Sequence, residues 1–200
     1  MGYTRAELES YRDATRPDLV EPGVRLLFVG INPGLWTAAT GTPFARPGNR
    51  FWPALVTAGI LPRLPRYSEP LGDEDRRLIF DAGVGVSNLV SRATARADEL
   101  SREELRAGAA ALVDRVAVWQ PRAVAVVGLT AYRQGFQRSR AAAGRQEESI
   151  AGVPTWVLPN PSGLNAHDTV DSLARAYADP ARAAGLIDGV RPARGDKVSR

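Results

Sequence analysis

Runs of apolar residues separated by more polar, helix-like segments divide the chain into alternating strands and helices. Mainly apolar runs at residues 24–29, 84–90 and 123–128 predict buried strands, and residues 147–150 and 155–158 look like two further strands on either side of Ala151 and Gly152. Strands that alternate with helices usually pair in parallel, because each crossover returns the chain to the same edge of the sheet. The pattern therefore predicts a three-layer α/β/α sandwich with a central, mostly parallel sheet.

Helical spacing of apolar positions fills most of the intervals between these runs. Thr4 with Glu7 and Ser101 with Glu104 have the spacing of capping boxes, in which the two residues satisfy backbone N–H groups of the first turn. Pro180 should break the last helix, since proline interrupts the hydrogen-bond ladder. The expected helices cover residues 4–16, 49–58, 73–82, 101–119, 130–137 and 168–177, with Asn49 and Asp168 as further caps.

Two loops rich in glycine, proline and asparagine follow predicted strands. The first is a long irregular segment at residues 30–48, and the second has the sequence PNPSGLNAHD at residues 159–168. The carboxyl ends of parallel strands lie along one edge of the sheet, where open α/β proteins bind ligands. We expect the two loops to meet at this edge and to form the functional site.

The length of the chain favours one domain. Its 200 residues, 44% of them apolar, can build a single hydrophobic core. We expect a helical extension at 1–22, a domain at 23–185 and a flexible basic tail at 186–200. No segment approaches the roughly 18 consecutive apolar residues of a membrane span, and the N-terminus lacks the apolar segment of a signal peptide. These features predict a cytoplasmic monomer with no membrane partner.

The composition excludes several kinds of chemistry. The absence of cysteine rules out disulfides, iron–sulfur clusters and thiol nucleophiles. With one histidine, His167, a zinc site would need mostly carboxylate ligands, so we expect no metal and no other cofactor. The only lysine, Lys197, lies in the expected tail, and a Schiff base with a core lysine is therefore excluded.

The charge of the chain is compatible with a nucleic-acid partner. The net charge is +4, the sequence pI is near 9.9, and nearly all the basic residues are arginine, whose forked donors suit phosphate. A mildly basic protein with an arginine-rich composition would show the same values. Charge alone leaves both interpretations open.

Three motifs give the chain a specific resemblance. GINPG occupies residues 30–34, TGTPFARPGNRFW residues 40–52 and NPSGL residues 160–164. A single GINPG would be a weak signal, but together, at the ends of two predicted strands, these motifs resemble the mismatch-specific uracil/thymine-DNA glycosylase family. The resemblance implies the uracil-DNA glycosylase fold and a double-stranded DNA partner that contains a lesion or mismatch. It also implies base flipping and hydrolysis of the bond between deoxyribose and a damaged pyrimidine opposite guanine.

The resemblance implies roles for Asn32 and Phe44 that suit their chemistry. Asn32 would position the attacking water, where other uracil glycosylases use aspartate, and Phe44 would stack on the flipped base. N-glycosidic cleavage passes through an oxocarbenium-like sugar and a departing base anion, so a neutral amide can serve by holding the water in place. Without the second motif, Asn32 would be interpreted as an ordinary turn residue and Phe44 as a core side chain.

The same resemblance implies further contacts with DNA. Gly163 and Leu164 would form a wedge that fills the space left by the flipped nucleotide. Ala166 stands in a region where other members carry an arginine, and we expect no direct role for His167. Thr37 is interpreted equally well as a loop residue or as a donor to the base or to a phosphate. The implied base-binding set is Gly30, Ile31, Gly34, Thr37, Phe44 and Asn88, and the implied wedge is Asn160, Pro161, Ser162, Gly163, Leu164 and Asn165.

The leading hypothesis is a monofunctional DNA glycosylase in base-excision repair that leaves an intact abasic site. The first alternative is a non-catalytic binder of mismatched or abasic DNA with the same fold, and a more distant one is a nucleoside hydrolase. The sequence leaves the damaged base open among uracil, thymine, etheno-cytosine, hypoxanthine and xanthine. One methyl group is worth only about 1 to 3 kcal/mol in a pocket, so small shifts of the loops decide between them.

Overall fold

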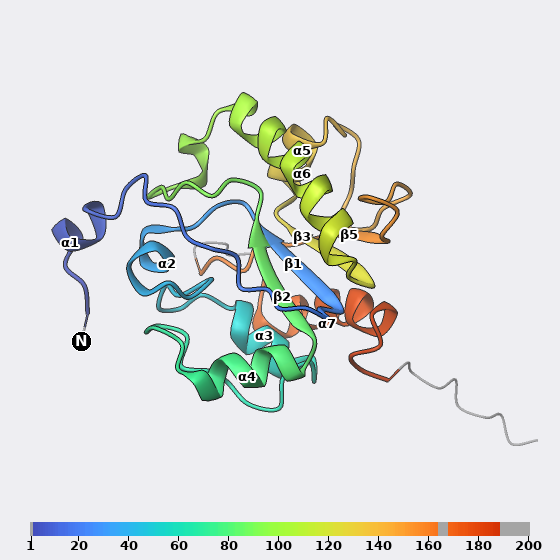
Figure 1. Cartoon of the computed structure of the whole chain (residues 1–200), viewed down its shortest axis with the longest axis horizontal. Helices are drawn as coiled ribbons and strands as arrows, with labels where there is room; N and C mark the ends of the chain where they lie inside the picture. The colour runs from blue at the N-terminus through green and yellow to red at the C-terminus, as the bar shows by residue number, and fades with distance from the viewer. Residues whose placement is uncertain (1, 164–167, 189–200) are drawn as a thin grey trace, which may run out of the picture.

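The predicted apolar runs supply most of a five-stranded sheet with the order β2-β1-β3-β5-β4 (Figure 1). The computed structural model describes residues 2–163 and 168–188. Strands β2, β1, β3 and β5 pair in parallel with their neighbours, while β4 runs antiparallel to β5 at the edge. The strands are β1 Leu26–Gly30, β2 Val84–Asn88, β3 Ala123–Val127, β4 Gly144–Arg145 and β5 Thr155–Leu158.

Helices cover both faces of this sheet, which confirms the three-layer α/β/α prediction (Figure 1). Helices α3, α4 and α7 pack on one face, and α5 and α6 pack on the other. In β1, Leu26 and Phe28 join the first core while Leu27 and Val29 join the second, because successive side chains of a strand point to opposite faces. The helices are α1 Arg5–Glu9, α2 Leu35–Thr40, α3 Phe51–Thr57, α4 Asp73–Asp81, the 3-10 helix η1 Ala97–Glu99, α5 Arg102–Trp119, α6 Leu129–Gly135 and α7 Val170–Ala183.

The long loop expected at residues 30–48 is wrong in part, because it contains helix α2. Gly34 precedes this helix, and Gly41, with a φ of 73°, ends it in the left-handed conformation that glycine adopts readily. Most of its six residues are buried. Tertiary packing thus stabilises a helix that is too short to show a clear periodicity in the sequence.

Two other helix boundaries differ from the prediction by small amounts. Helix α3 begins at Phe51, but Asn49 still satisfies its first turn, because the Asn49 Oδ1 accepts a hydrogen bond from the Phe51 N–H at 2.9 Å. Helix α7 is capped by Thr169 rather than Asp168, and the expected break at Pro180 is wrong, because the helix continues through this proline to Ala183. Pro180 is buried together with Tyr177, Ala178 and Ala181, so packing offsets the loss of one backbone donor.

The predicted N-terminal helix ends early. The capping box of Thr4 and Glu7 is present, but α1 stops at Glu9, and Asp13 adopts a φ of 63°. The chain then runs beside the sheet, where Thr15 and Leu19 form isolated antiparallel bridges with Arg92 and Val86. This segment covers part of the free edge of β2, which would otherwise expose unpaired backbone groups.

The strand predicted at residues 147–150 is also wrong. The described structure has β4 at Gly144–Arg145 instead, and Ile150 makes only an isolated bridge with Val153 across a tight turn. Ala151 and Gly152 both have positive φ in that turn, so the chain reverses there before β5. Because Ile150 is the only apolar residue at positions 147–150, the sequence could not distinguish these two arrangements.

The C-terminal end of the described chain adds to the core. Leu186 and Ile187, at the start of the expected tail, pack against the core that contains α3 and α7. Residues 189–200 lie outside the described residues, so a flexible basic tail stays a prediction. None of the described helices has the length and apolar character needed to span a membrane.

Candidate active site

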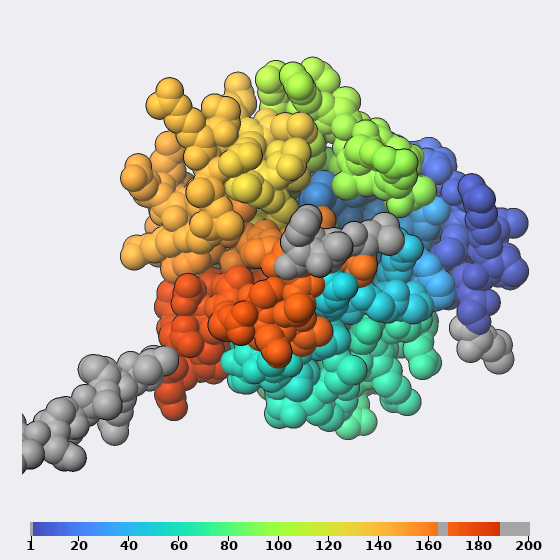
Figure 2. Space-filling model, turned by 180° about the vertical axis from the view of Figure 1, so that it is seen from behind, coloured from blue at the N-terminus to red at the C-terminus, as the bar shows by residue number. Residues whose placement is uncertain are grey.

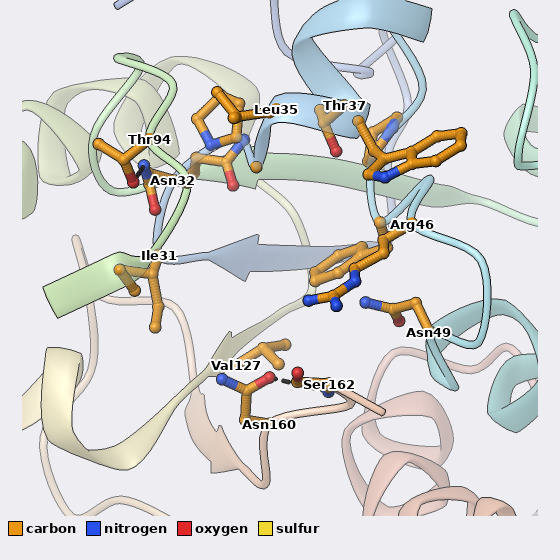
Figure 3. Close-up of a pocket in the computed structure, with 18 of the residues that line it drawn as sticks. Ile31, Asn32, Leu35, Thr37, Arg46, Asn49, Thr94, Val127, Asn160 and Ser162 are labelled. Carbon is orange, nitrogen blue, oxygen red and sulfur yellow. Dashed lines mark hydrogen bonds between the residues drawn. The ribbon is translucent and has the colours of Figure 1, made fainter. Parts of the chain in front are cut away.

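A cavity of about 400 Å³ opens at the carboxyl edge of the sheet (Figure 3). The segment after β1 supplies its residues from Ile31 to Thr37, and the loop after β5 supplies Asn160 and Ser162. The ends of β2 and β3 contribute Asn88 and Val127. The two loops singled out in the sequence therefore meet at one site, with β3 between the strands that carry them.

Asn32 is held at this cavity by its own amide group. The Asn32 Nδ2 donates hydrogen bonds to the Arg92 carbonyl oxygen and to the Thr94 Oγ1, each at 2.8 Å. The Thr94 hydroxyl in turn donates to the Arg96 carbonyl oxygen at 2.7 Å, so it must accept from Asn32. These hydrogen bonds place the Asn32 nitrogen next to Thr94 and leave the amide oxygen as the end without a partner among the described residues.

The free end is an acceptor that faces the cavity. Figure 3 shows the Asn32 oxygen pointing away from Thr94, and among the described residues this oxygen accepts no hydrogen bond. An amide oxygen can accept a proton of a water molecule and thereby orient the water's lone pair. Because the nitrogen is held by two partners, the amide cannot rotate freely, and a water bound to it would be held in a defined place.

The floor of the cavity is formed by Phe44 and Asn88, both of which pack against Gly30. Gly30 itself does not line the cavity, and a Cβ atom on it would lie 2.6 Å from the Asn88 Oδ1 and 3.4 Å from the Phe44 Cζ, so a larger residue there would displace the Asn88 side chain. Phe44 stacks on Phe51 with ring centroids 4.0 Å apart, while it also lines the cavity. It is thus both a side chain packed on the core and a planar surface available to a ligand.

The remaining residues of the implied base-binding set surround this floor. Ile31 and Thr37 line the cavity (Figure 3), and Thr37 lies on the buried side of α2 rather than in a loop. Gly34 also lines the cavity, and a Cβ atom there would meet open space. Close packing therefore explains the glycine at position 30 but not the one at position 34.

The implied wedge loop is tied to the loop that follows α2. The Arg50 N–H donates to the Pro161 carbonyl oxygen at 3.0 Å, and the Arg50 guanidinium donates to the Asp168 carbonyl oxygen at 2.5 Å. A Cβ atom on Gly163 would lie 2.8 Å from the Gly48 carbonyl oxygen, so the two backbones are in contact. The Asn160 Oδ1 accepts from the Ser162 N–H at 3.0 Å and shapes the start of this loop. The predictions for Leu164, Asn165, Ala166 and His167 concern residues outside the described part of the chain.

Comparison with known proteins identifies the family. A model of the Uracil DNA glycosylase superfamily matches residues 17–180. The chain belongs to this superfamily. Among solved structures, a solution NMR structure of a proposed uracil DNA glycosylase from Methanosarcina acetivorans is similar, with a TM-score of 0.56 and 16% identity over 82% of this chain and 96% of that chain. At this identity the similarity supports the uracil DNA glycosylase fold alone, whereas the superfamily match supports a DNA glycosylase role.

The cavity of this superfamily member has one charged side chain in its described lining. Arg46 is the only charged residue among the described residues that line the cavity, and its exposed guanidinium makes no hydrogen bond or ion pair with them. Figure 3 shows the end of its side chain beside Asn49. No group of three or more potential metal ligands occurs in the described part of the chain. The arrangement can hold a neutral base and water, with one cation placed to meet an anion.

The two residues that hold the Asn32 amide were not predicted from the sequence. Thr94 is almost fully buried and Arg92 is held by its own ion pairs, with Asp13 at 2.7 Å and Glu104 at 2.8 Å. Hydrogen bonds with Glu104 and Asp13 raise the pKa of Arg92 above its ordinary value. Their sequence signal is weak, because a threonine and an arginine in a polar loop are common, and only the sheet order brings them to Asn32.

Proposed function

We propose that this member of the superfamily is a monofunctional, mismatch-specific DNA glycosylase that removes uracil opposite guanine. The observation that carries the proposal is the fixed amide of Asn32, whose free oxygen faces a cavity that also contains an aromatic ring. The resemblance of the motifs around Asn32, Phe44 and Asn160 to the mismatch-specific family supports the narrower assignment.

The proposed reaction depends more on how the base and the water are positioned than on a strong acid or base. A flipped pyrimidine would stack on Phe44, and a water held by Asn32 would attack C1′ of the deoxyribose. The water oxygen forms the new bond to C1′ as the C1′–N bond breaks, and the bonding electron pair leaves with the base. The proton lost from the water passes to the departing base or to solvent, because a neutral amide does not take it up.

The proposed specificity for the base rests on polar groups at the cavity floor. The Asn88 side chain, beside Gly30, carries both a donor and an acceptor, as needed to pair with the edge of uracil. The opposite guanine would face the loop that begins at Asn160. Thymine and etheno-cytosine are further candidate substrates of the same site.

A monofunctional mechanism follows from the lack of a core lysine. The only lysine of the chain, Lys197, lies outside the described residues, and the described lining of the cavity contains no lysine that could attack C1′ and cut the strand through a Schiff base. The product would be an abasic site in an intact strand. Borohydride should then trap no stoichiometric protein–DNA adduct, and efficient trapping would contradict this part of the proposal.

Single-turnover assays on a set of duplexes test the function. Each duplex carries uracil, thymine or etheno-cytosine opposite guanine, with an undamaged cytosine–guanine duplex as the control. We expect release of uracil and an alkali-sensitive abasic site, with no release from the control. Tight, salt-sensitive binding without release of any base would instead support the non-catalytic binder.

A further inference from the structure

We propose that the N-terminal segment, residues 2–16, is a working part of the active site that positions Asn32. This segment precedes residues 17–180, the part of the chain that matches the superfamily. The inference rests on the proposed function, because it concerns the asparagine that would hold the water. It is carried by contacts that join the segment to residues 92–94.

The first contacts are backbone hydrogen bonds. The Asp13 N–H donates to the Ala93 carbonyl oxygen at 3.0 Å, and the Ala93 N–H donates to the Ala14 carbonyl oxygen at 2.9 Å. Thr15 and Arg92 continue this pairing as an antiparallel bridge. Both backbone polar groups of Ala93 are therefore used by the N-terminal segment.

The second contacts are ionic. The Arg92 Nη1 lies 2.7 Å from the Asp13 Oδ1, while the Nε of the same guanidinium lies 2.8 Å from the Glu104 Oε1. One residue earlier, Arg12 pairs with Glu99. These pairs join the N-terminal segment to η1 and to the first turn of α5.

The link to the chemistry passes through the residues on either side of Ala93. The Arg92 carbonyl oxygen and the Thr94 hydroxyl are the two acceptors of the Asn32 amide. Holding Ala93 in place fixes both of these acceptors, and through them the direction of the Asn32 oxygen. Asp13 is thus a positioning residue and has no contact with substrate in this account.

The same segment also reaches the cavity wall. Leu8 of α1 lines the cavity, as does Trp36 of α2. Tyr3 packs edge-on against Trp36, with ring centroids 5.3 Å apart. Figure 1 shows α1 beside α2, and in Figure 2 the dark blue N-terminal segment lies along the outside of the paler blue region that contains α2. The segment therefore closes one side of the site while it fixes residues 92–94.

Substitutions at Asp13 test this inference at one position. Asp13 has a φ of 63°, so proline, which fixes φ near −65° and has no N–H, cannot keep the pairing with Ala93. Glycine keeps both the N–H and the backbone conformation and removes only the carboxylate. We expect Asp13→Pro to lose at least tenfold more single-turnover excision rate than Asp13→Gly, while both variants bind the same duplex within twofold. Asp13→Val, which keeps the N–H but strains the backbone, is the milder variant should the proline variant fail to fold.

Two measurements distinguish a role of the N-terminal segment in positioning Asn32 from a general loss of structure. They also distinguish failure of this inference from failure of the proposed glycosylase function. In a Thr94→Val background, where only the Arg92 carbonyl acceptor remains to be displaced, Asp13→Pro should cost less excision rate than it does in the native background. In ¹H–¹⁵N NMR spectra, the Asn32 side-chain amide protons should exchange slowly with solvent in the native protein and rapidly in the proline or valine variant. Equal losses in both backgrounds, or unchanged exchange, would overturn the inference. The NMR result stands even if the native protein releases no base, which would count against the proposed function alone.

Discussion

In the proposed mechanism, Asn32 is a neutral side chain that serves hydrolysis because its neighbours fix its direction. The Thr94 hydroxyl and the Arg92 carbonyl oxygen take both donors of the amide, and the remaining oxygen faces the cavity. A carboxylate would activate water more strongly, whereas an amide contributes mainly by orienting it. The rate should therefore depend on the residues that hold Asn32 as well as on Asn32 itself.

Replacing Thr94 tests that dependence. Thr94→Val keeps the shape of the side chain but removes the acceptor, which leaves one amide donor without its buried partner. An unpaired buried donor costs about 1 to 3 kcal/mol, so we expect single-turnover excision to fall roughly tenfold or more with little change in DNA affinity. Thr94→Ser keeps the hydroxyl and should retain most of the rate. Equal rates for the valine and serine variants would contradict the role of this hydroxyl.

Arg46 should contact DNA through a phosphate. It is exposed at the cavity mouth and has no ionic partner among the described residues, so a phosphate near the flipped nucleotide can approach it. Losing one phosphate contact lowers the slope of log affinity against log salt by about 0.9 on duplex DNA. We expect this change for Arg46→Gln, measured on a uracil–guanine duplex. Arg77→Gln, an exposed arginine on α4 away from the cavity, is the matched control and should leave the slope unchanged.

The sequence motifs predicted some of the residues at the cavity but missed others. Asn32, Phe44 and Asn160 were placed at one site from short local patterns, and the structure brings all three to the cavity. Thr94 contacts Asn32 across 62 positions of sequence. No local pattern reports a contact of that separation, because it depends on β2 lying beside β1 in the sheet.

The elements that position the site differ in how clearly the sequence encodes them. Strands β1, β3 and β5 were predictable because they are buried on both faces and need continuous apolar runs. The start of α5 was predictable because Ser101 and Glu104 form a local capping box. Helix α2 and strand β4 were not predicted, since each is short and depends on distant packing partners for its stability.

Gly108 tests how α5 supports the loop that holds Asn32. A Cβ atom there would lie 2.4 Å from the Leu89 carbonyl oxygen, in the segment that leads from β2 to Thr94. Glycine to alanine within a helix usually stabilises by about 1 kcal/mol, but here the added methyl must displace backbone, and overpacking costs about 1 to 3 kcal/mol. We expect Gly108→Ala to lower the free energy of unfolding in urea. An increase in stability would show that α5 does not approach the loop this closely.

The molecule as a whole brings four strand ends to one cavity whose described lining holds no histidine, lysine or carboxylate. Within those residues, the charge resides on Arg46. The chemistry must then come from position and from the shape of the cavity. The sequence predicted the fold behind this cavity, because the apolar pattern indicates the strands of the sheet and the two loops that follow β1 and β5.

The pH dependence of excision should reflect this composition. With no described lining group that titrates near neutrality, we expect the single-turnover rate to change by less than about threefold between pH 6 and 9. The affinity for DNA is measured at each pH as the control. A decline in rate centred near pH 6.5, the ordinary pKa of histidine, would assign a direct role to His167.

The most direct test of the account compares the native protein with Asn32→Ala on one uracil–guanine duplex, with excision and binding measured side by side. We predict that the native protein releases uracil in a single turnover and leaves an intact abasic strand. We predict that Asn32→Ala binds equally well but releases uracil on the order of 100-fold more slowly, as loss of one preorganised polar group does in other enzymes. Equal rates of release by the two proteins, or binding without release by the native protein, would contradict the account.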